Sequence, residues 1–284
     1  MQHLTFPDGS TRPALGLGTW RMGESARARR DEIAAVRLAL ELGYRVIDTA
    51  EMYGEGGAEE VVGAALAEAL RAGTLRREEL FVVSKVYPHH ASRRGVPQAC
   101  ERSLARLGLD RIDLYLLHWR GAHPLAETVD AFEALGAAGR IGAWGVSNFD
   151  VDDMEELASV PQGAACAANQ VYFSLSERGA GVALLPWLQR RGMPLMAYCP
   201  IDQGRLAADA RLGALAAARG VSAAQLGLAW VLHQRGVMAI PKAVRAAHLR
   251  ENLAAAELVL DAAVLHELDA LFPPPAARGP LAMV

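Results

Sequence analysis

The chain has 284 residues, of which 52% are hydrophobic and 21% charged, so it is neither a disordered segment nor a fibre and can bury a substantial core. Its formal net charge of -3, spread over both signs, provides no basic face for nucleic acid. No apolar run approaches the roughly 18 residues that cross a bilayer, so we expect neither a nucleic-acid nor a membrane partner.

The three cysteines, Cys100, Cys166 and Cys199, are odd in number and show no CxxC spacing. The first residues lack the basic and then apolar pattern of a secretory signal. We therefore expect a reduced, cytoplasmic protein without a disulfide framework. No linker or low-complexity tract divides the chain, so we expect one domain over residues 1–284, in a monomer.

Along the chain, a short N-terminal hairpin with its turn at residues 7–10 comes first. Eight short apolar runs predict strands over residues 15–20, 45–50, 80–86, 113–119, 141–148, 165–171, 194–200 and 237–242. Helical periodicity between the strands predicts helices over 31–42, 58–71, 97–107, 125–138, 152–157, 181–191, 206–219 and 223–234. This alternation implies parallel strands, and closure as a single (β/α)8 TIM barrel of the α/β class fits better than an open sheet.

Polar and titratable side chains gather at the carboxyl ends of the predicted strands, where barrel enzymes place their active sites. Seven strands end in this way, in chain order with Asp48, Lys85, His118, Ser147 and Asn148, Asn169 and Gln170, Tyr198, and Lys242. A single polar strand end is ordinary. Agreement among seven predicts an active site on this face of the barrel.

Lysine is rare in this chain. Of the 29 basic residues only Lys85 and Lys242 are lysines, and the other 27 are arginines. Because arginine is used wherever a general surface cation is needed, both lysines are candidates for tasks that suit a compact ammonium better than a planar guanidinium. The alternative is that an arginine-rich composition leaves two lysines by chance.

Four residues together could form a tuned acid without a nucleophile, if the barrel places the second to fourth strands side by side. A tyrosine has an ordinary pKa of about 10, too high for efficient proton donation at neutral pH. A neighbouring ammonium favours the phenolate, so we expect Lys85 to lower the pKa of Tyr53. Asp48 would hold the ammonium, and His118 would orient a bound carbonyl. Taken singly, each residue also has an ordinary structural explanation.

Short motifs around these residues resemble the aldo-keto reductase family. DTAEMYG at residues 48–54, VSKV at 83–86 and LYLLHW at 114–119 contain the Asp, Tyr, Lys and His. The similarity continues through GLGTW at 16–20, GVSNF at 145–149, NQV at 169–171, AYCP at 197–200, IPK at 240–242 and Glu251 with Asn252. These motifs follow the family order over nearly the whole chain.

The resemblance implies metal-free reduction of small aldehydes or ketones by hydride transfer from NADPH. Tyr53 would be the proton donor, Lys85 its partner held by Asp48, and His118 a second hydrogen-bond donor to the substrate oxygen. The resemblance also implies a cofactor site in which a tyrosine stacks on the nicotinamide. Its residues in this sequence are Gly18, Thr19, Ser147, Asn148, Gln170, Tyr198, Lys242, His248 and Asn252.

The sequence departs from the family pattern where the adenosine end of the cofactor is bound. Lys242 matches, but Ala243 stands where a serine is usual and His248 where an arginine is usual. Arg245 or Arg250 could replace the missing contacts to the 2′-phosphate. We therefore expect NADPH as cofactor and NADH as a weaker second one. No GxGxxG turn joins a strand to a helix, which argues against a Rossmann site.

The substrate pocket is expected to be an aromatic cup of Trp20, Tyr87 and Trp119 around the acid. Such a cup suits small, poorly charged carbonyl compounds. The C-terminal tail, residues 271–284, either lies over this cup as a lid or frays.

Two other functions are open. Some proteins of this barrel family bind NADPH chiefly as redox-sensing regulatory subunits with little turnover. A phosphate-handling barrel enzyme is the third reading, but the sequence lacks a glycine-rich phosphate loop after the seventh strand. We expect no metal site, because the adjacent residues His89 and His90 do not readily face one ion.

Overall fold

Eight parallel strands form the centre of the structure, a computed structural model that describes residues 2–284. They are β3 (Leu17–Gly18), β4 (Val46–Asp48), β5 (Phe81–Val86), β6 (Ile112–Leu117), β7 (Ile141–Ser147), β8 (Asn169–Tyr172), β9 (Leu195–Tyr198) and β10 (Val237–Ala239). Each strand pairs with the next, and parallel bridges from Leu15 to Ala239 and from Gly18 to Lys242 join the last strand to the first. The sheet therefore closes, and the predicted (β/α)8 barrel is confirmed.

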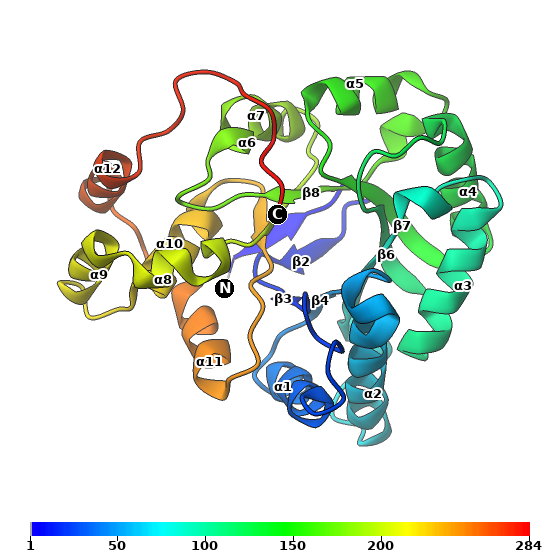
Figure 1. The fold of residues 1–284 in the computed structure, drawn as a ribbon, viewed down its shortest axis with the longest axis horizontal. Coiled ribbons are helices and arrows are strands. Elements are labelled where there is room, and N and C mark those ends of the chain that lie inside the picture. Colours follow the sequence, from blue (N-terminus) through cyan, green and yellow to red (C-terminus); the bar gives the residue numbers. More distant parts are fainter. Residues whose placement is uncertain (1) are drawn as a thin grey trace.

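Helices surround the barrel, as Figure 1 shows. The helices that agree with the predicted segments to within a few residues are α1 (Arg29–Glu41), α2 (Gly57–Arg71), α3 (Gly95–Leu107), α4 (Leu125–Ala137), α5 (Val151–Ser159) and α10 (Ala223–His233). The helix predicted over 181–191 is split into α6 (Gly179–Val182) and α7 (Leu184–Gln189). Ala183 leaves the helical region shortly before Pro186, which has no N–H to continue the ladder.

The helix predicted over 206–219 also consists of two, α8 (Arg205–Ala208) and α9 (Ala210–Ala217). Asp209 between them is extended, and its carboxylate accepts the N–H groups of Arg211 and Leu212, so it starts a new helix. Two more helices, α11 (Ala246–Ala255) and α12 (Ala262–Leu271), lie outside the predicted segments. The strand predicted over 165–171 is shorter, because Gly163–Ala165 forms a 3-10 turn before β8.

The inside of the barrel is apolar towards the amino ends of the strands and polar at their carboxyl ends. Alternate strand residues face inward, and the inward positions on the apolar side hold a cluster that includes Val46 on β4 and Val83 on β5. The next inward-facing positions on these two strands, two residues closer to the carboxyl end, are Asp48 and Lys85. Other members of the cluster are also followed two residues later by predicted site residues. Leu116, Ala168, Met196 and Ile240 are followed in this way by His118, Gln170, Tyr198 and Lys242.

The N-terminal hairpin covers the opposite end of the barrel. β1 (His3–Thr5) and β2 (Thr11–Pro13) pair antiparallel around residues 7–10, as predicted. Phe6 packs against Phe81 at the start of β5, with ring centroids 5.2 Å apart. The hairpin thus shields the apolar core at the amino ends of the strands and leaves their carboxyl ends for a binding site.

The segment after α12 has no regular secondary structure and crosses the mouth of the barrel, as the red trace in Figure 1 shows. Arg278 forms ion pairs with Asp150 and Asp152 at the start of α5. Of the two outcomes considered for residues 271–284, the structure has the tail over the mouth.

No helix in residues 2–284 is both long and apolar enough to span a membrane. The single domain over 1–284, the monomeric state, the lack of a nucleic-acid partner and the cytoplasmic location stay predictions.

Candidate active site

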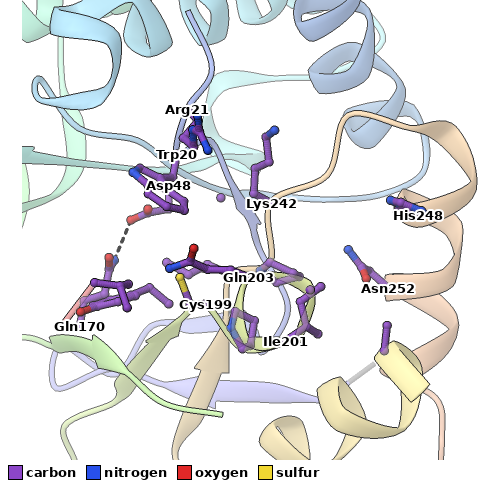
Figure 2. Close-up of a pocket in the computed structure, with 18 of the residues that line it drawn as sticks. Trp20, Arg21, Asp48, Gln170, Cys199, Ile201, Gln203, Lys242, His248 and Asn252 are labelled. Atoms are coloured by element: carbon purple, nitrogen blue, oxygen red, sulfur yellow. Dashed lines mark hydrogen bonds between the residues drawn. The ribbon is translucent and has the colours of Figure 1, made fainter. Parts of the chain in front are cut away.

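A cavity of about 830 Å³ opens at the carboxyl ends of the strands, and Figure 2 shows some of the side chains around it. The predicted residues that line it are Gly18, Trp20, Asp48, Tyr53, His118, Trp119, Asn148, Gln170, Tyr198, Lys242, His248 and Asn252. The other lining residues are Arg21, Met52, Cys199, Pro200, Ile201, Gln203, Gly204, Ala207, Ser222, Ala223, Ala224, Ile240, Pro241, Arg245, Glu251, Met283 and Val284.

Beneath Tyr53, the ammonium of Lys85 has a partner for each of its three hydrogens. Nζ lies 2.8 and 3.0 Å from the two carboxylate oxygens of Asp48 and 2.9 Å from the carbonyl oxygen of Thr49. The third partner is the hydroxyl oxygen of Tyr53, at 3.2 Å. The side chains of Lys85 and Asp48 are 0% and 3% exposed, so water does not compete for these bonds. The structure thus brings Asp48, Tyr53 and Lys85 together.

The loop after β4 carries Tyr53 back over Lys85. In the 3-10 turn Tyr53–Gly56, Gly54 has a φ of 58° and Gly56 a φ of 93°. A Cβ on Gly54 would lie 2.9 Å from the carbonyl carbon of Gly23, so this close approach requires glycine. α2 begins directly after the turn, and Tyr53 is therefore fixed between a strand and a helix.

Burial governs the charges of this group. It raises the pKa of Tyr53 well above the usual value, and the negative charge of Asp48 acts in the same direction. Burial also raises the pKa of Asp48 and lowers the pKa of Lys85, against the attraction between the two. The expectation that Lys85 lowers the pKa of Tyr53 is therefore wrong for this structure. The Asp48 carboxylate offsets the ammonium, and the phenol keeps its proton at neutral pH.

His118 lies beside Tyr53 on the cavity wall, with ring centroids 5.7 Å apart, and Trp119 packs against it. Within residues 2–284 its buried Nδ1 has no hydrogen-bond partner. Burial, and then the charge of Lys85, lower the pKa of His118 well below the usual value. The imidazole is therefore neutral and can donate one hydrogen bond without carrying a charge.

Asn148 ties together the strand ends on another part of the wall. Its backbone is left-handed, with a φ of 59°, directly after β7. Its Nδ2 donates to the carbonyl oxygen of His118 at 3.1 Å and to Oγ of Ser147 at 3.2 Å. Its Oδ1 accepts the hydroxyl hydrogen of Tyr198 at 2.8 Å. In this structure the amide of Asn148 is therefore committed to protein groups.

Gln170 and Tyr198 reach the cavity from β8 and β9. Nε2 of Gln170 donates to Oδ1 of Asp48 at 2.7 Å, the bond drawn as a dashed line in Figure 2. The ring of Tyr198 stacks on Tyr172, with centroids 5.8 Å apart and an angle of 14° between the planes. The hydroxyl of Tyr172 in turn donates to Asp202, which fixes the loop after β9.

The far end of the cavity lies between β10 and α11, where Figure 2 shows Lys242, His248 and Asn252. Of the two arginines considered as replacement phosphate contacts, Arg245 lines the cavity and Arg250 does not. This end therefore carries positive side chains at the place that sequence reasoning assigned to the 2′-phosphate.

Several lining residues were missed by sequence reasoning. Arg21 directly follows the GLGTW motif and could have been found from it. Ser222 caps α10 by accepting the N–H of Gln225, a capping pattern visible in the sequence. Gln203 comes from the loop after β9, where its φ is 52°, and nothing in the sequence indicates that it faces the cavity.

Besides Lys85, three predicted site residues lie behind the cavity surface. Oγ1 of Thr19 donates to the carbonyl oxygen of Asp48 at 2.9 Å, and Ser147 is buried beneath Asn148. Tyr87 packs edge-on against Trp119, with centroids 6.0 Å apart. The structure therefore places Tyr87 behind the expected aromatic cup rather than in it.

Within residues 2–284, no three side chains of His, Cys, Asp or Glu are arranged to hold a metal ion. Nδ1 of His90 lies 3.0 Å from Oε1 of Glu51, and His89 packs against the ring of Tyr87. The fold thus brings the carboxylate of Glu51 to one of the two histidines.

The chain matches known proteins over nearly its whole length. The model of the aldo/keto reductase family matches residues 14–272. The chain belongs to the aldo/keto reductase family. It is 49% identical over 286 residues to methylglyoxal reductase YeaE of Escherichia coli (strain K12), across 99% of this chain and 98% of that protein. It is 35% identical over 264 residues to a glyoxal reductase of Bacillus subtilis (strain 168), across 93% of this chain and 90% of that protein.

Solved structures of the family agree with this fold. A crystal structure of an aldo/keto reductase from Klebsiella pneumoniae in complex with NADP and acetate is 48% identical, with a TM-score of 0.94 over 99% of each chain. A second, from the same organism and in complex with NADPH, has the same identity and TM-score over 100% of each chain. As an aldo/keto reductase, the chain is an oxidoreductase.

Proposed function

We propose that this aldo/keto reductase reduces small aldehydes and ketones, methylglyoxal among them, to alcohols with NADPH, and that Tyr53 donates the proton. The observation that carries the proposal is the position of Nζ of Lys85, which donates to Asp48, to the Thr49 carbonyl and to the Tyr53 hydroxyl at once. The names of two relatives, a methylglyoxal reductase and a glyoxal reductase, support the substrate class.

The bond from Lys85 sets what the Tyr53 hydroxyl can do. Because its oxygen accepts a hydrogen from the ammonium, the hydroxyl keeps its own hydrogen to donate into the cavity. As that proton moves to a carbonyl oxygen, negative charge develops on the phenolic oxygen, and the ammonium 3.2 Å away stabilises it. Lys85 therefore acts on the transition state rather than on the resting phenol.

His118 is proposed as the second donor to the same carbonyl oxygen. It lies on the cavity wall beside Tyr53, and burial lowers its pKa so that it is neutral. A neutral imidazole polarises the carbonyl by a hydrogen bond and leaves the proton transfer to Tyr53.

The cavity residues fit a nicotinamide dinucleotide phosphate. Arg21, Lys242 and Arg245 offer positive charge for its phosphates, Gln170 offers a polar atom for its carboxamide, and Tyr198 offers a flat ring. NADPH, when bound, supplies a hydride to the carbonyl carbon. The relatives from Klebsiella pneumoniae in complex with NADP and with NADPH support this cofactor. NADH is proposed as a weaker second cofactor, because His248 replaces a permanent cation.

Apolar side chains surround the reacting end. Trp20, Met52 and Trp119 line the cavity near Tyr53, and Met283 joins them from the C-terminal tail. A wall of this kind offers no counter-charge to a substrate, so it favours small carbonyl compounds without a net charge.

The test is the oxidation of NADPH by the purified protein with methylglyoxal, followed by absorbance, in the wild type and in Tyr53→Phe. We expect turnover in the wild type and a loss of about 10² to 10⁴ in kcat in the variant, the usual contribution of a general acid. NADPH affinity, measured by fluorescence, should not change in the variant. Turnover of Tyr53→Phe near the wild-type rate would refute Tyr53 as the donor.

The same measurement separates the alternative function. A wild-type protein that binds NADPH tightly but reduces neither methylglyoxal nor other small aldehydes would refute the reductase and favour the redox-sensing regulatory subunit.

A further inference from the structure

The side chain of Gln170 crosses the inside of the barrel. Gln170 is on β8, the sixth strand, and Asp48 is on β4, the second, so the bond between them joins residues 122 positions apart on opposite sides of the barrel. Gln170 is 1% exposed and also lines the cavity. Figure 2 shows this bond at the end of the cavity beneath Trp20. One end of the side chain is thus in the buried acid group and the other at the cavity.

The chemistry of the two groups fixes the orientation of the amide. An ionised carboxylate only accepts hydrogen bonds, so Nε2 of Gln170 must face Asp48, as the 2.7 Å distance to Oδ1 shows. Oε1 is then the one acceptor of the side chain left for a ligand, beside the second hydrogen of Nε2. It can accept an N–H of a carboxamide, and such a bond draws electron density from the amide whose nitrogen donates to Asp48.

The other amides at these strand ends are committed elsewhere. Asn148 uses both hydrogens on His118 and Ser147. Asn169 donates to the carbonyl oxygen of Phe149 and does not line the cavity. Within residues 2–284, Gln170 is therefore the one amide that reaches both the cavity and Asp48.

Asp48 connects the amide of Gln170 to the proton donor through Lys85. Its Oδ1 accepts from both Gln170 and Lys85, and the same ammonium donates to Tyr53. A change in the bond from Gln170 alters how Asp48 shares the ammonium, which in turn alters the bond between Lys85 and Tyr53.

We propose that Gln170 is a positioning residue that couples the occupant of the cavity to the Asp48–Lys85–Tyr53 group, through the bond from its Nε2 to Asp48. Its Oε1 would accept a hydrogen bond from the carboxamide of the cofactor. This bond would adjust the hydrogen bond between Lys85 and Tyr53 for proton transfer when the cofactor is bound. This inference rests on the proposed function, because it takes a carboxamide-bearing cofactor as the occupant.

The scarcity of lysine permits a direct measurement. With an isotopic carbon label at Cε of lysine, the protein gives two NMR signals, one from Lys85 and one from Lys242, and Lys242→Ala assigns them. The Lys85 signal reports the state of the buried group without any turnover. It therefore distinguishes failure of this inference from failure of the proposed function.

The first arm uses Gln170→Glu without cofactor. Two carboxyl groups in hydrogen-bond contact share a proton, so the Lys85 signal should gain an inflection between about pH 5 and pH 8 that the wild type lacks. The matched control is Gln203→Glu, which adds the same charge to the cavity wall but has no bond to Asp48. Both variants retain the other titratable residues that act on this site, which are Tyr53, Glu59, His118 and Cys199. A Lys85 titration in Gln170→Glu that matches Gln203→Glu would overturn the link to Asp48.

The second arm uses Gln170→Leu, which keeps the volume and removes the amide. NADPH should shift the Lys85 signal of the wild type, and at saturation the shift should fall by at least half in Gln170→Leu. Adenosine 2′,5′-bisphosphate, which lacks the nicotinamide, should shift the signal in neither protein. An NADPH shift of full size in Gln170→Leu would overturn the coupling. A wild type in which NADPH binds but gives no Lys85 shift would do the same. If NADPH fails to bind, the proposed function fails, and the first arm still decides the bond to Asp48.

Discussion

Nζ of Lys85 lies 3.2 Å from the hydroxyl oxygen of Tyr53 and 4.8 Å from the centre of its ring, in a site where the lysine side chain is fully buried. The ammonium sits between this phenol and the carboxylate of Asp48. Its three hydrogens are matched by three acceptors, which makes the site specific for a compact cation rather than for positive charge as such.

Lys85→Arg should therefore fail to support turnover, although it keeps the charge. A guanidinium is wider and has five N–H donors for three acceptors, so it must displace Tyr53 or Asp48. We expect kcat to fall by about 100-fold or more, comparable to removal of one strong transition-state hydrogen bond. The measurement is kcat with NADPH and methylglyoxal.

Arg71→Lys is the control for this exchange of cations. Arg71 is exposed at the end of α2 and does not line the cavity, so kcat should stay near the wild-type value. If Lys85→Arg keeps turnover within about threefold of wild type, less than 1 kcal/mol of transition-state stabilisation is lost and the geometric argument fails.

His118 should make the protein less stable in mild acid. Its pKa is about 6.5 in the unfolded chain and well below this in the folded state, because burial disfavours the charged form. The neutral folded state keeps its full stability above about pH 6.5 and loses it as pH falls, by up to about 1.4 kcal/mol per pH unit. From pH 7 to pH 5 the wild type should therefore lose more unfolding free energy than His118→Gln, by at most about 2 kcal/mol.

Chemical denaturation at a series of pH values measures this difference. His266→Gln, on the exposed side of α12, is the control and should follow the wild type. Parallel profiles of the wild type and His118→Gln would mean that His118 takes up its proton in the folded protein as readily as in the unfolded chain.

The alternation of side chains along the strands explains why the sequence predicts the positions of Asp48 and Lys85 well. Lys85 and Asp48 follow inward core valines by two residues, so the pattern that identifies β4 and β5 also points both side chains into the barrel. The bond from Gln170 to Asp48 has no such signal, because it depends on strands that meet across the closed barrel. The pKa of Tyr53 was misjudged for a related reason: a pairwise argument from Lys85 leaves out both the burial of the phenol and the charge of Asp48.

The positions of side chains that depend on the packing of loops could not be predicted from the sequence either. Tyr87 follows β5 directly and was placed in the cup by its position, but its hydroxyl donates to Glu55 and its ring packs behind Trp119. The C-terminal tail is also joined to the start of α5 by an ion pair between residues more than a hundred positions apart, which no local pattern in the sequence indicates.

Lys242 should determine the preference for NADPH over NADH. It lines the far end of the cavity with His248 and Arg245. Removing a cation that pairs with the 2′-phosphate weakens NADPH binding and leaves NADH binding nearly unchanged. We expect Lys242→Ala to lower the ratio of the two affinities by about tenfold and His248→Ala by about twofold to threefold.

Fluorescence titration with both cofactors gives this ratio. Arg250→Ala is the control, because Arg250 is on the same helix as His248 but does not line the cavity. A ratio that does not change in Lys242→Ala would show that the phosphate binds elsewhere.

Arg278 should hold the C-terminal tail in its place over the cavity. Its guanidinium lies 2.9 Å from carboxylate oxygens of both Asp150 and Asp152 at the start of α5. Within the described tail, residues 273–284, it is the one side chain with hydrogen bonds or ion pairs, while Met283 and Val284 line the cavity. Loss of this contact should let the tail move away from the substrate, without touching the proton donor.

Arg278→Ala should therefore raise KM for methylglyoxal by about twofold to fivefold and leave kcat nearly unchanged, the scale of an exposed ion pair. Because salt screens exposed charges, added salt should raise KM of the wild type towards that of the variant and have little effect on the variant itself. Arg219→Ala, which removes a comparable ion pair with Glu267 away from the cavity, serves as the control and should keep the wild-type KM. If Arg278→Ala and Arg219→Ala give the same KM, the tail does not depend on this contact, and its position over the mouth must come from the packing of its apolar residues.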